Sequence, residues 1–150
     1  MSLKERLTED MKQAMKDKES GKLRLSVIRM VRANIKNVEI DSKQELSDDE
    51  VLGVVSKEVK MRRDSIEEFT KGNRLDLVEN LEQEIEVLMK YLPEQLSETE
   101  VRTLVEQAVA ESKAVSPKEM GKVMAVLMPK VKGRADGKLV NTIVREMLSQ

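Results

Sequence analysis

Apolar residues recur every three or four positions along most of the chain, which is the spacing that gathers them on one face of an α-helix. The first set predicts a helix from Leu3 to about Glu19: Leu3, Leu7, Met11 and Met15. Ser20 and Gly21 are expected to end this helix. The next set predicts a second helix over about 22–39: Leu23, Val27, Met30, Val31, Ile35 and Val38.

Two further helices are predicted before the first proline. Ser47 and Glu50 have the spacing of a capping box, and the helix that they open should end at Gly72. A fourth helix should follow from about Arg74 and break ahead of Pro93. Its apolar positions alternate at spacings of three and four, as in an antiparallel bundle: Val78, Leu81, Ile85, Leu88 and Leu92.

The remaining chain predicts three shorter helices. Ser97 should cap a helix that lasts to about Ser112. Ser116 and the following proline should open the next helix, and Pro129 should stop it. Asp136 should cap the last one. We therefore expect an all-α fold, with an antiparallel bundle of about four helices in residues 1–93 and a three-helix C-terminal domain in residues 94–150.

The composition supports an all-helical core and excludes several types of catalytic and metal site. Phe69 and Tyr91 are the only aromatics, and six glycines with three prolines are too few for the turns of a β-sandwich. The chain has no cysteine and no histidine, so thiolate chemistry, disulfides and the commonest metal ligand are excluded. We find no catalytic set, no metal site and no cofactor motif. Three nearby carboxylates are interpreted as solvated, because spacing by two divides them between helix faces: Glu82, Glu84 and Glu86.

No membrane partner is expected, because no apolar run approaches the ~18 residues that a membrane span needs. The N-terminal sequence MSLKERLTED also lacks the apolar segment of a secretory signal peptide. These features predict a cytoplasmic protein.

Cations gather near the end of the chain. From Lys118 onward seven basic residues stand against three acidic ones, although the whole chain carries a net charge of -1. A local cation excess in an acidic protein indicates an anionic partner. The candidate nucleic-acid contacts are these: Lys118, Lys122, Lys130, Lys132, Gly133, Arg134, Gly137, Lys138, Asn141 and Arg145. The alternative is a surface turn with ordinary charges.

A second basic strip lies on the predicted second helix, opposite its apolar face: Lys22, Arg29, Arg32 and Lys36. It is interpreted either as the solvated face of a surface helix or as a secondary phosphate contact.

The segments YLPEQLSETEV and MGKVMAVLMPKVKGRADGKLVNTIVREML resemble the YqeY-like family, and the resemblance covers the whole chain. The part from Leu96 onward is similar to the tail domain shared with the B subunit of tRNA-dependent amidotransferase, which amidates glutamate or aspartate already charged on tRNA. The resemblance implies a helical bundle, a three-helix domain and a tail that engages tRNA. The tail positions that it implies as contacts are Lys130, Lys132, Gly133, Arg134, Gly137 and Asn141.

Three functions follow as hypotheses. The first is a non-catalytic tRNA-binding or tRNA-associated protein that contacts the phosphate backbone by shape rather than sequence. The second is a protein adaptor for an aminoacyl-tRNA enzyme or amidotransferase, suggested by twenty acidic and ten basic residues between Asn37 and Ser116. The third is an accessory factor of glutamine-dependent amide transfer on charged tRNA, that is, a carbon–nitrogen ligase with glutamine as the amido-nitrogen donor. A ligase label would be inherited from the subunit that shares the tail.

Overall fold

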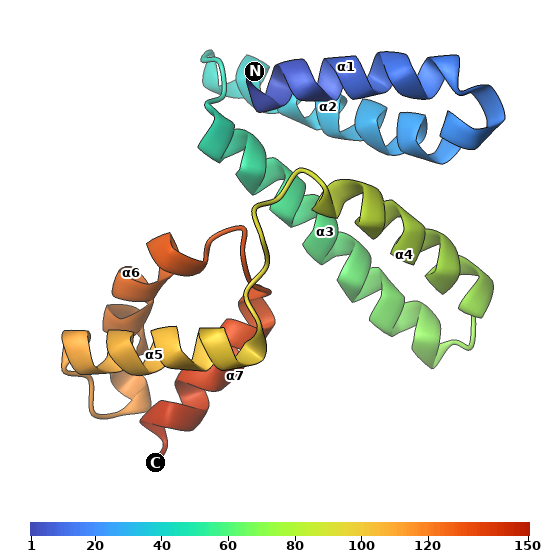
Figure 1. Cartoon of the computed structure of the whole chain (residues 1–150). Helices are drawn as coiled ribbons and strands as arrows, with labels where there is room; N and C mark the ends of the chain where they lie inside the picture. The colour runs from blue at the N-terminus through green and yellow to red at the C-terminus, as the bar shows by residue number, and fades with distance from the viewer. The chain divides into compact units, whose positions relative to one another are not determined.

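A computed structural model describes residues 1–150 and contains helices as its only regular secondary structure (Figure 1), which confirms the all-α prediction. The chain divides into two compact units, Met1–Leu92 and Pro93–Gln150. The helices are α1 (Leu3–Lys16), α2 (Lys22–Ser42), α3 (Asp48–Lys71), α4 (Leu75–Met89), α5 (Glu98–Ser112), α6 (Met120–Val131) and α7 (Gly137–Leu148). None is long and apolar enough to cross a membrane.

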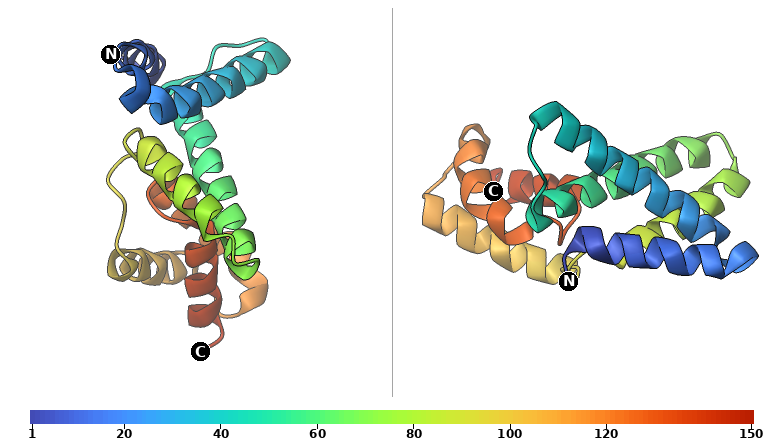
Figure 2. Two further views of the ribbon diagram at one scale, coloured as in Figure 1. Left: turned by 90° about the vertical axis from the view of Figure 1, so that its right-hand side faces the viewer. Right: turned by 90° about the horizontal axis from the view of Figure 1, so that it is seen from above.

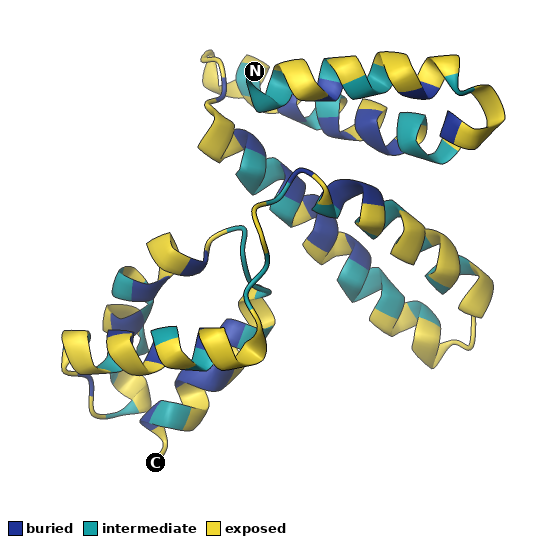
Figure 3. Ribbon diagram, in the orientation of Figure 1, coloured by how far each residue is buried: buried dark blue, intermediate teal, exposed yellow.

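The N-terminal unit consists of two helical hairpins, α1 with α2 and α3 with α4, which run in different directions (Figures 1 and 2). A short 3-10 helix, Lys18–Gly21, makes the first turn. Figure 3 shows the buried residues along the sides on which the helices face each other. Leu7, Ile28 and Leu88 are almost completely buried, and each buried side chain of this size stabilises the fold by about 1.5–3 kcal/mol.

The C-terminal end of α4 is bound to α1 through the only tyrosine of the chain. The Tyr91 hydroxyl donates a hydrogen bond of 2.5 Å to the Asp10 carboxylate, and the Arg6 guanidinium lies 4.7 Å from the ring centroid. Burial, followed by the bond to Asp10, raises the pKa of Tyr91. Arg6 also donates to the Lys90 carbonyl at 2.7 Å. These contacts hold the two hairpins of the N-terminal unit together.

The C-terminal unit packs α5 against both α6 and α7. Its core is aliphatic and centres on Val105, Leu127 and Ile143, each of which is fully buried. On α7 the buried residues Val140, Ile143 and Val144 recur at helical spacing, so the opposite face is left to polar side chains.

Three local sequence predictions are wrong. α1 ends at Lys16 rather than about Glu19, because the chain enters the 3-10 turn. Ser116 makes no side-chain capping bond, since the first turn after it is also 3-10. Pro129 lies inside α6, which continues to Val131. A proline removes one backbone donor and disturbs the preceding turn, and here the helix accommodates it within its last turn.

The interpretation of Glu84 as solvated is also wrong. Arg62 and Glu58 are each only 6% exposed, and Arg62 Nη1 donates to Glu58 Oε2 at 2.6 Å. Arg62 Nη2 lies 3.4 Å from Glu84 Oε1, and Asn34 Nδ2 donates to Glu58 Oε1 at 2.5 Å. This buried polar cluster (Asn34, Glu58, Arg62 and Glu84) links α2, α3 and α4.

Ser47 and Ser116, both predicted as helix caps, should respond differently to alanine. Ser47 forms the predicted capping box, in which its hydroxyl accepts from Glu50 N at 3.3 Å and Ser47 N donates to the Glu50 carboxylate at 3.1 Å. We expect Ser47→Ala to lower the free energy of unfolding by about 1 kcal/mol. Ser116→Ala should change it by less than about 0.5 kcal/mol, since no side-chain bond is lost. Urea denaturation followed by circular dichroism measures both, and equal losses would contradict the assignment.

Candidate nucleic-acid interface

The loop between α6 and α7 is shaped by one glycine and one backbone carbonyl. The Val131 carbonyl accepts from Arg134 N at 2.9 Å and from Ala135 N at 3.2 Å. Gly133 has a φ of 75°, which lies in the left-handed region that a residue with a Cβ adopts only at a cost. Gly133 is therefore needed for the turn itself.

The segment that begins the C-terminal unit supports this loop. Gln95 Nε2 donates to the Gly133 carbonyl at 2.8 Å, and Leu96 N donates to the Arg134 carbonyl at 2.8 Å. Arg134 Nε lies 3.4 Å from the Glu94 carbonyl, so this guanidinium is partly committed to the fold. Sequence reasoning missed the role of Gln95, because helical periodicity carries no signal for a contact between two irregular segments.

Asp136 caps α7 as predicted, and its carboxylate accepts from Lys138 N at 3.2 Å. The cap occupies a backbone donor that a phosphate would otherwise use, so side chains are left to make contacts with an anion. Four polar side chains spaced by three, one and three residues share the exposed face of α7: Lys138, Asn141, Thr142 and Arg145.

Carboxylates of the chain already neutralise some of the candidate cations. Lys130 Nζ lies 3.6 Å from the Glu111 carboxylate, and Lys122 Nζ lies 3.5 Å from that of Glu119. Glu119 is half-buried and the other three side chains are exposed, so both pairs are weak and a polyanion can replace the carboxylate. Lys132 and Arg145 are exposed and have no such ion pair.

The ten candidate contacts do not form one cluster. Lys118 lies in the 3-10 helix Pro117–Glu119 and Lys122 in the first turn of α6, and at 1.5 Å per residue the length of α6 separates them from the loop by roughly 15 Å. The other eight lie on the last turn of α6, the loop and α7: Lys130, Lys132, Gly133, Arg134, Gly137, Lys138, Asn141 and Arg145. We call this group the tail patch.

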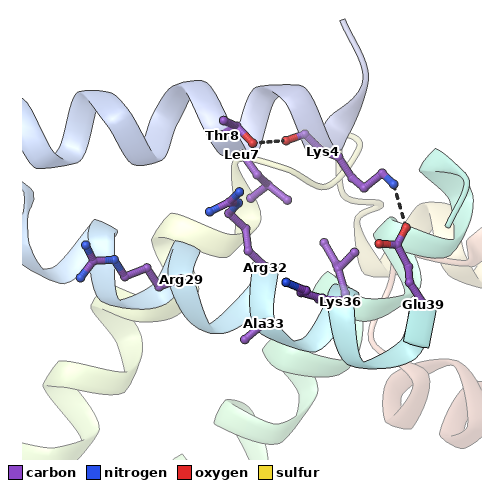
Figure 4. Close-up of a pocket in the computed structure, with 9 residues that line it drawn as sticks. Lys4, Leu7, Thr8, Arg29, Arg32, Ala33, Lys36 and Glu39 are labelled. Carbon is purple, nitrogen blue, oxygen red and sulfur yellow. Dashed lines mark hydrogen bonds and ion pairs between the residues drawn. The ribbon is translucent and has the colours of Figure 1, made fainter. Parts of the chain in front are cut away.

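The second basic strip is also divided. Arg29, Arg32 and Lys36 line a cavity of about 450 Å³ between α1 and α2, together with Lys4 of α1 (Figure 4). Lys22 lines a different cavity, which it shares with the carboxylates of Glu19 and Glu84. No group of three or more acidic side chains is arranged to hold a metal ion.

A family model described as Yqey-like protein matches residues 4–148. A relative from Lachancea thermotolerans, named Altered inheritance of mitochondria protein 41, mitochondrial, is 40% identical over 114 residues, which are 74% of this chain and 60% of that protein. A relative of the same name from Pyrenophora tritici-repentis is 34% identical over 95% of this chain and 79% of that protein. The E subunit of glutamyl-tRNA(Gln) amidotransferase from Thermococcus gammatolerans is 41% identical over 59 residues, which are 37% of this chain and 9% of that protein.

These relatives contradict the cytoplasmic location predicted from the sequence, because the first two are named as mitochondrial proteins. The prediction is wrong because it was based only on the lack of an apolar leader and of a membrane span. Mitochondrial transit peptides are amphipathic and rich in arginine and serine, so neither test detects them.

Proposed function

The chain belongs to the YqeY-like family, and we propose on this basis that it is a non-catalytic tRNA-binding protein whose C-terminal unit contacts the phosphate backbone. The observation that carries the proposal is the tail patch, in which a glycine-shaped loop and the polar face of α7 bear exposed cations. A relative named for an enzyme that acts on glutamyl-tRNA(Gln) supports the choice of tRNA as partner.

The tail patch has the side chains that backbone recognition uses. Lys132 and Arg145 supply charge that displaces counterions, and the Asn141 amide supplies directed hydrogen bonds. Phe69 and Tyr91 both belong to the N-terminal unit, so the C-terminal unit has no aromatic ring for base stacking. Recognition should therefore depend on shape and phosphate position rather than on base identity.

Removal of three tail-patch cations should weaken tRNA binding and reduce its salt dependence. We expect the Lys130→Gln, Lys132→Gln, Arg145→Gln variant to lose about tenfold or more in affinity. The slope of log affinity against log salt should decrease by about 2–3, since each neutralised phosphate contributes about 0.9 on a duplex. A tRNA titration of the full chain from roughly 50 to 200 mM salt measures both quantities.

A matched control removes the same charge from the N-terminal unit. Lys12, Lys57 and Lys60 are exposed and lie on α1 and α3, and their replacement by glutamine should leave binding close to that of the parent. If the tail variant and the control bind tRNA equally well, the proposal fails.

A second candidate, a protein adaptor, is favoured by the acidic excess between Asn37 and Ser116 and by exposed methionines. Met30, Met61 and Met128 are between 43% and 52% exposed, and methionine surfaces adapt to different partners. Affinity capture from cells separates the candidates: recovery of RNA without a stoichiometric protein counts against the adaptor.

A further inference from the structure

We propose that the cavity between α1 and α2 binds the phosphate group of a small phosphorylated molecule, at a site independent of the tail patch. Both helices belong to the N-terminal unit, whereas the tail patch belongs to the C-terminal unit. The proposal therefore goes beyond the tRNA contact and can fail or succeed separately from it.

The cavity brings together cations from two helices. Figure 4 shows Arg32 extending from α2 towards α1, and Lys4 reaching from α1 to Glu39. Arg29 and Lys36 lie on the same side of α2 as Arg32, one turn before and one turn after it. The nine lining residues include four cations and one carboxylate, so the cavity wall is strongly positive.

The single carboxylate is already occupied. Glu39 Oε2 accepts from Lys4 Nζ at 2.7 Å and from Leu46 N at 2.8 Å. The Lys4 hydrogen bond, followed by the Leu46 N–H, holds the pKa of the Glu39 carboxyl below its usual value, so Glu39 stays ionised and paired. The other three cations are left without a carboxylate of their own.

The unpaired cations have unused donors. Arg32 Nη1 lies 2.9 Å from the sulfur of Met11, which is a weak acceptor, and Arg32 makes no stronger bond. Arg29 and Lys36 make no ion pair. Arg32 lies between Arg29 and Lys36 along α2, one turn from each, and all three line the cavity. The Arg32 guanidinium can therefore pair with a phosphate in a bidentate way, and a neighbouring cation can add a further donor.

The dimensions favour a small ligand over a nucleic-acid strand. A volume of about 450 Å³ lies in the range of small-molecule sites, and the exposed Ala33 offers apolar contact to the rest of the ligand. Glu5 and Glu9 line a neighbouring depression along α1, where they would repel a strand that continued past the cavity. No aromatic side chain lines the cavity, so a stacked base is not expected.

Calorimetric titration of the full chain with ribose 5-phosphate, inorganic phosphate and unphosphorylated ribose tests the proposal. We expect ribose 5-phosphate to bind more tightly than inorganic phosphate, and ribose not to bind. The Arg29→Gln, Arg32→Gln variant should lose about tenfold or more in affinity for ribose 5-phosphate, because hydrogen bonds between charged groups are strong. Lys36→Gln changes an exposed residue that makes no bond in the fold, and it should lower the affinity for ribose 5-phosphate several-fold. This variant keeps the proposal testable if the double arginine variant misfolds.

Lys22→Gln is the matched control, since it removes the same charge from α2 at a different cavity and should leave ribose 5-phosphate binding unchanged. The proposal is overturned if ribose binds as tightly as ribose 5-phosphate. It is equally overturned if Lys22→Gln lowers the affinity for ribose 5-phosphate as much as Lys36→Gln does. It is also overturned if neither ribose 5-phosphate nor inorganic phosphate binds the parent, and a loss of tRNA affinity by the arginine variant would then assign the cavity to nucleic acid. The tail variant should bind ribose 5-phosphate normally, so failure of the tRNA proposal remains distinguishable.

Discussion

Arg62→Met should lower the free energy of unfolding of the N-terminal unit by about 3–5 kcal/mol, the usual result of removing one partner from a buried ion pair. The Arg62 and Glu58 side chains are each only 7% exposed. Methionine fills a similar volume, so the loss comes from the Glu58 carboxylate, which would keep only the Asn34 amide as partner. Urea denaturation followed by circular dichroism measures the change.

Removal of both charges should restore most of this stability. In the Glu58→Gln, Arg62→Met double variant no buried charge is left unpaired in this pair, and Asn34 can still bond to the new amide. Glu84 also loses its Arg62 contact, but its side chain is 15% exposed and can take up water. A single Arg62→Met variant within about 1 kcal/mol of the parent would mean that the cluster is hydrated rather than buried.

Features that depend on neighbouring residues could be predicted from the sequence. The caps at Ser47 and Ser97 are confirmed as capping boxes, because the serine and the glutamate three residues later satisfy each other's backbone donors in any helix. The helix end at Gly72 and the cap at Asp136 are also confirmed, and both depend on bonds to residues within one turn. The all-α fold follows from many such local signals that agree.

Contacts between distant segments could not be predicted. Glu84 and Arg62 are 22 residues apart and meet only because α3 and α4 form a hairpin. A helical projection shows that Glu84 faces away from Glu82 and Glu86, but it does not show which face another helix covers. The Lys130–Glu111 pair joins α6 to α5 and escapes prediction in the same way.

The basic strip on α2 shows a related limit of helical projection. Projection groups residues by angle around the axis and ignores their height along it. Lys22 and Arg29 share an angle, but seven residues at 1.5 Å each separate them by roughly 10 Å. Lys4, which completes the cavity, lies on another helix and has no signal in the α2 sequence.

The hairpin of α1 and α2, which forms the cavity, closes where Ala14 of α1 meets Gly21 in the turn into α2. A Cβ at position 21 would lie 2.1 Å from the Ala14 carbonyl oxygen and 2.9 Å from its Cα. Both are backbone atoms, so no side-chain rotation relieves the overlap. Ala14 and Gly21 are themselves buried, which leaves the helices no direction to shift without opening the hairpin.

Gly21→Ala should therefore destabilise the N-terminal unit by about 3 kcal/mol, at the upper end of the range for overpacked sites. It should also weaken ribose 5-phosphate binding, because separation of α1 from α2 moves Lys4 away from Arg32. Gly53→Ala is the control: it lies inside α3 with nothing within 4 Å of the added Cβ, and it should stabilise the unit by about 0.5–1 kcal/mol. Urea denaturation measures the free energy of unfolding of both variants. Similar values would show that α1 and the turn can move apart at position 21 without loss of stability.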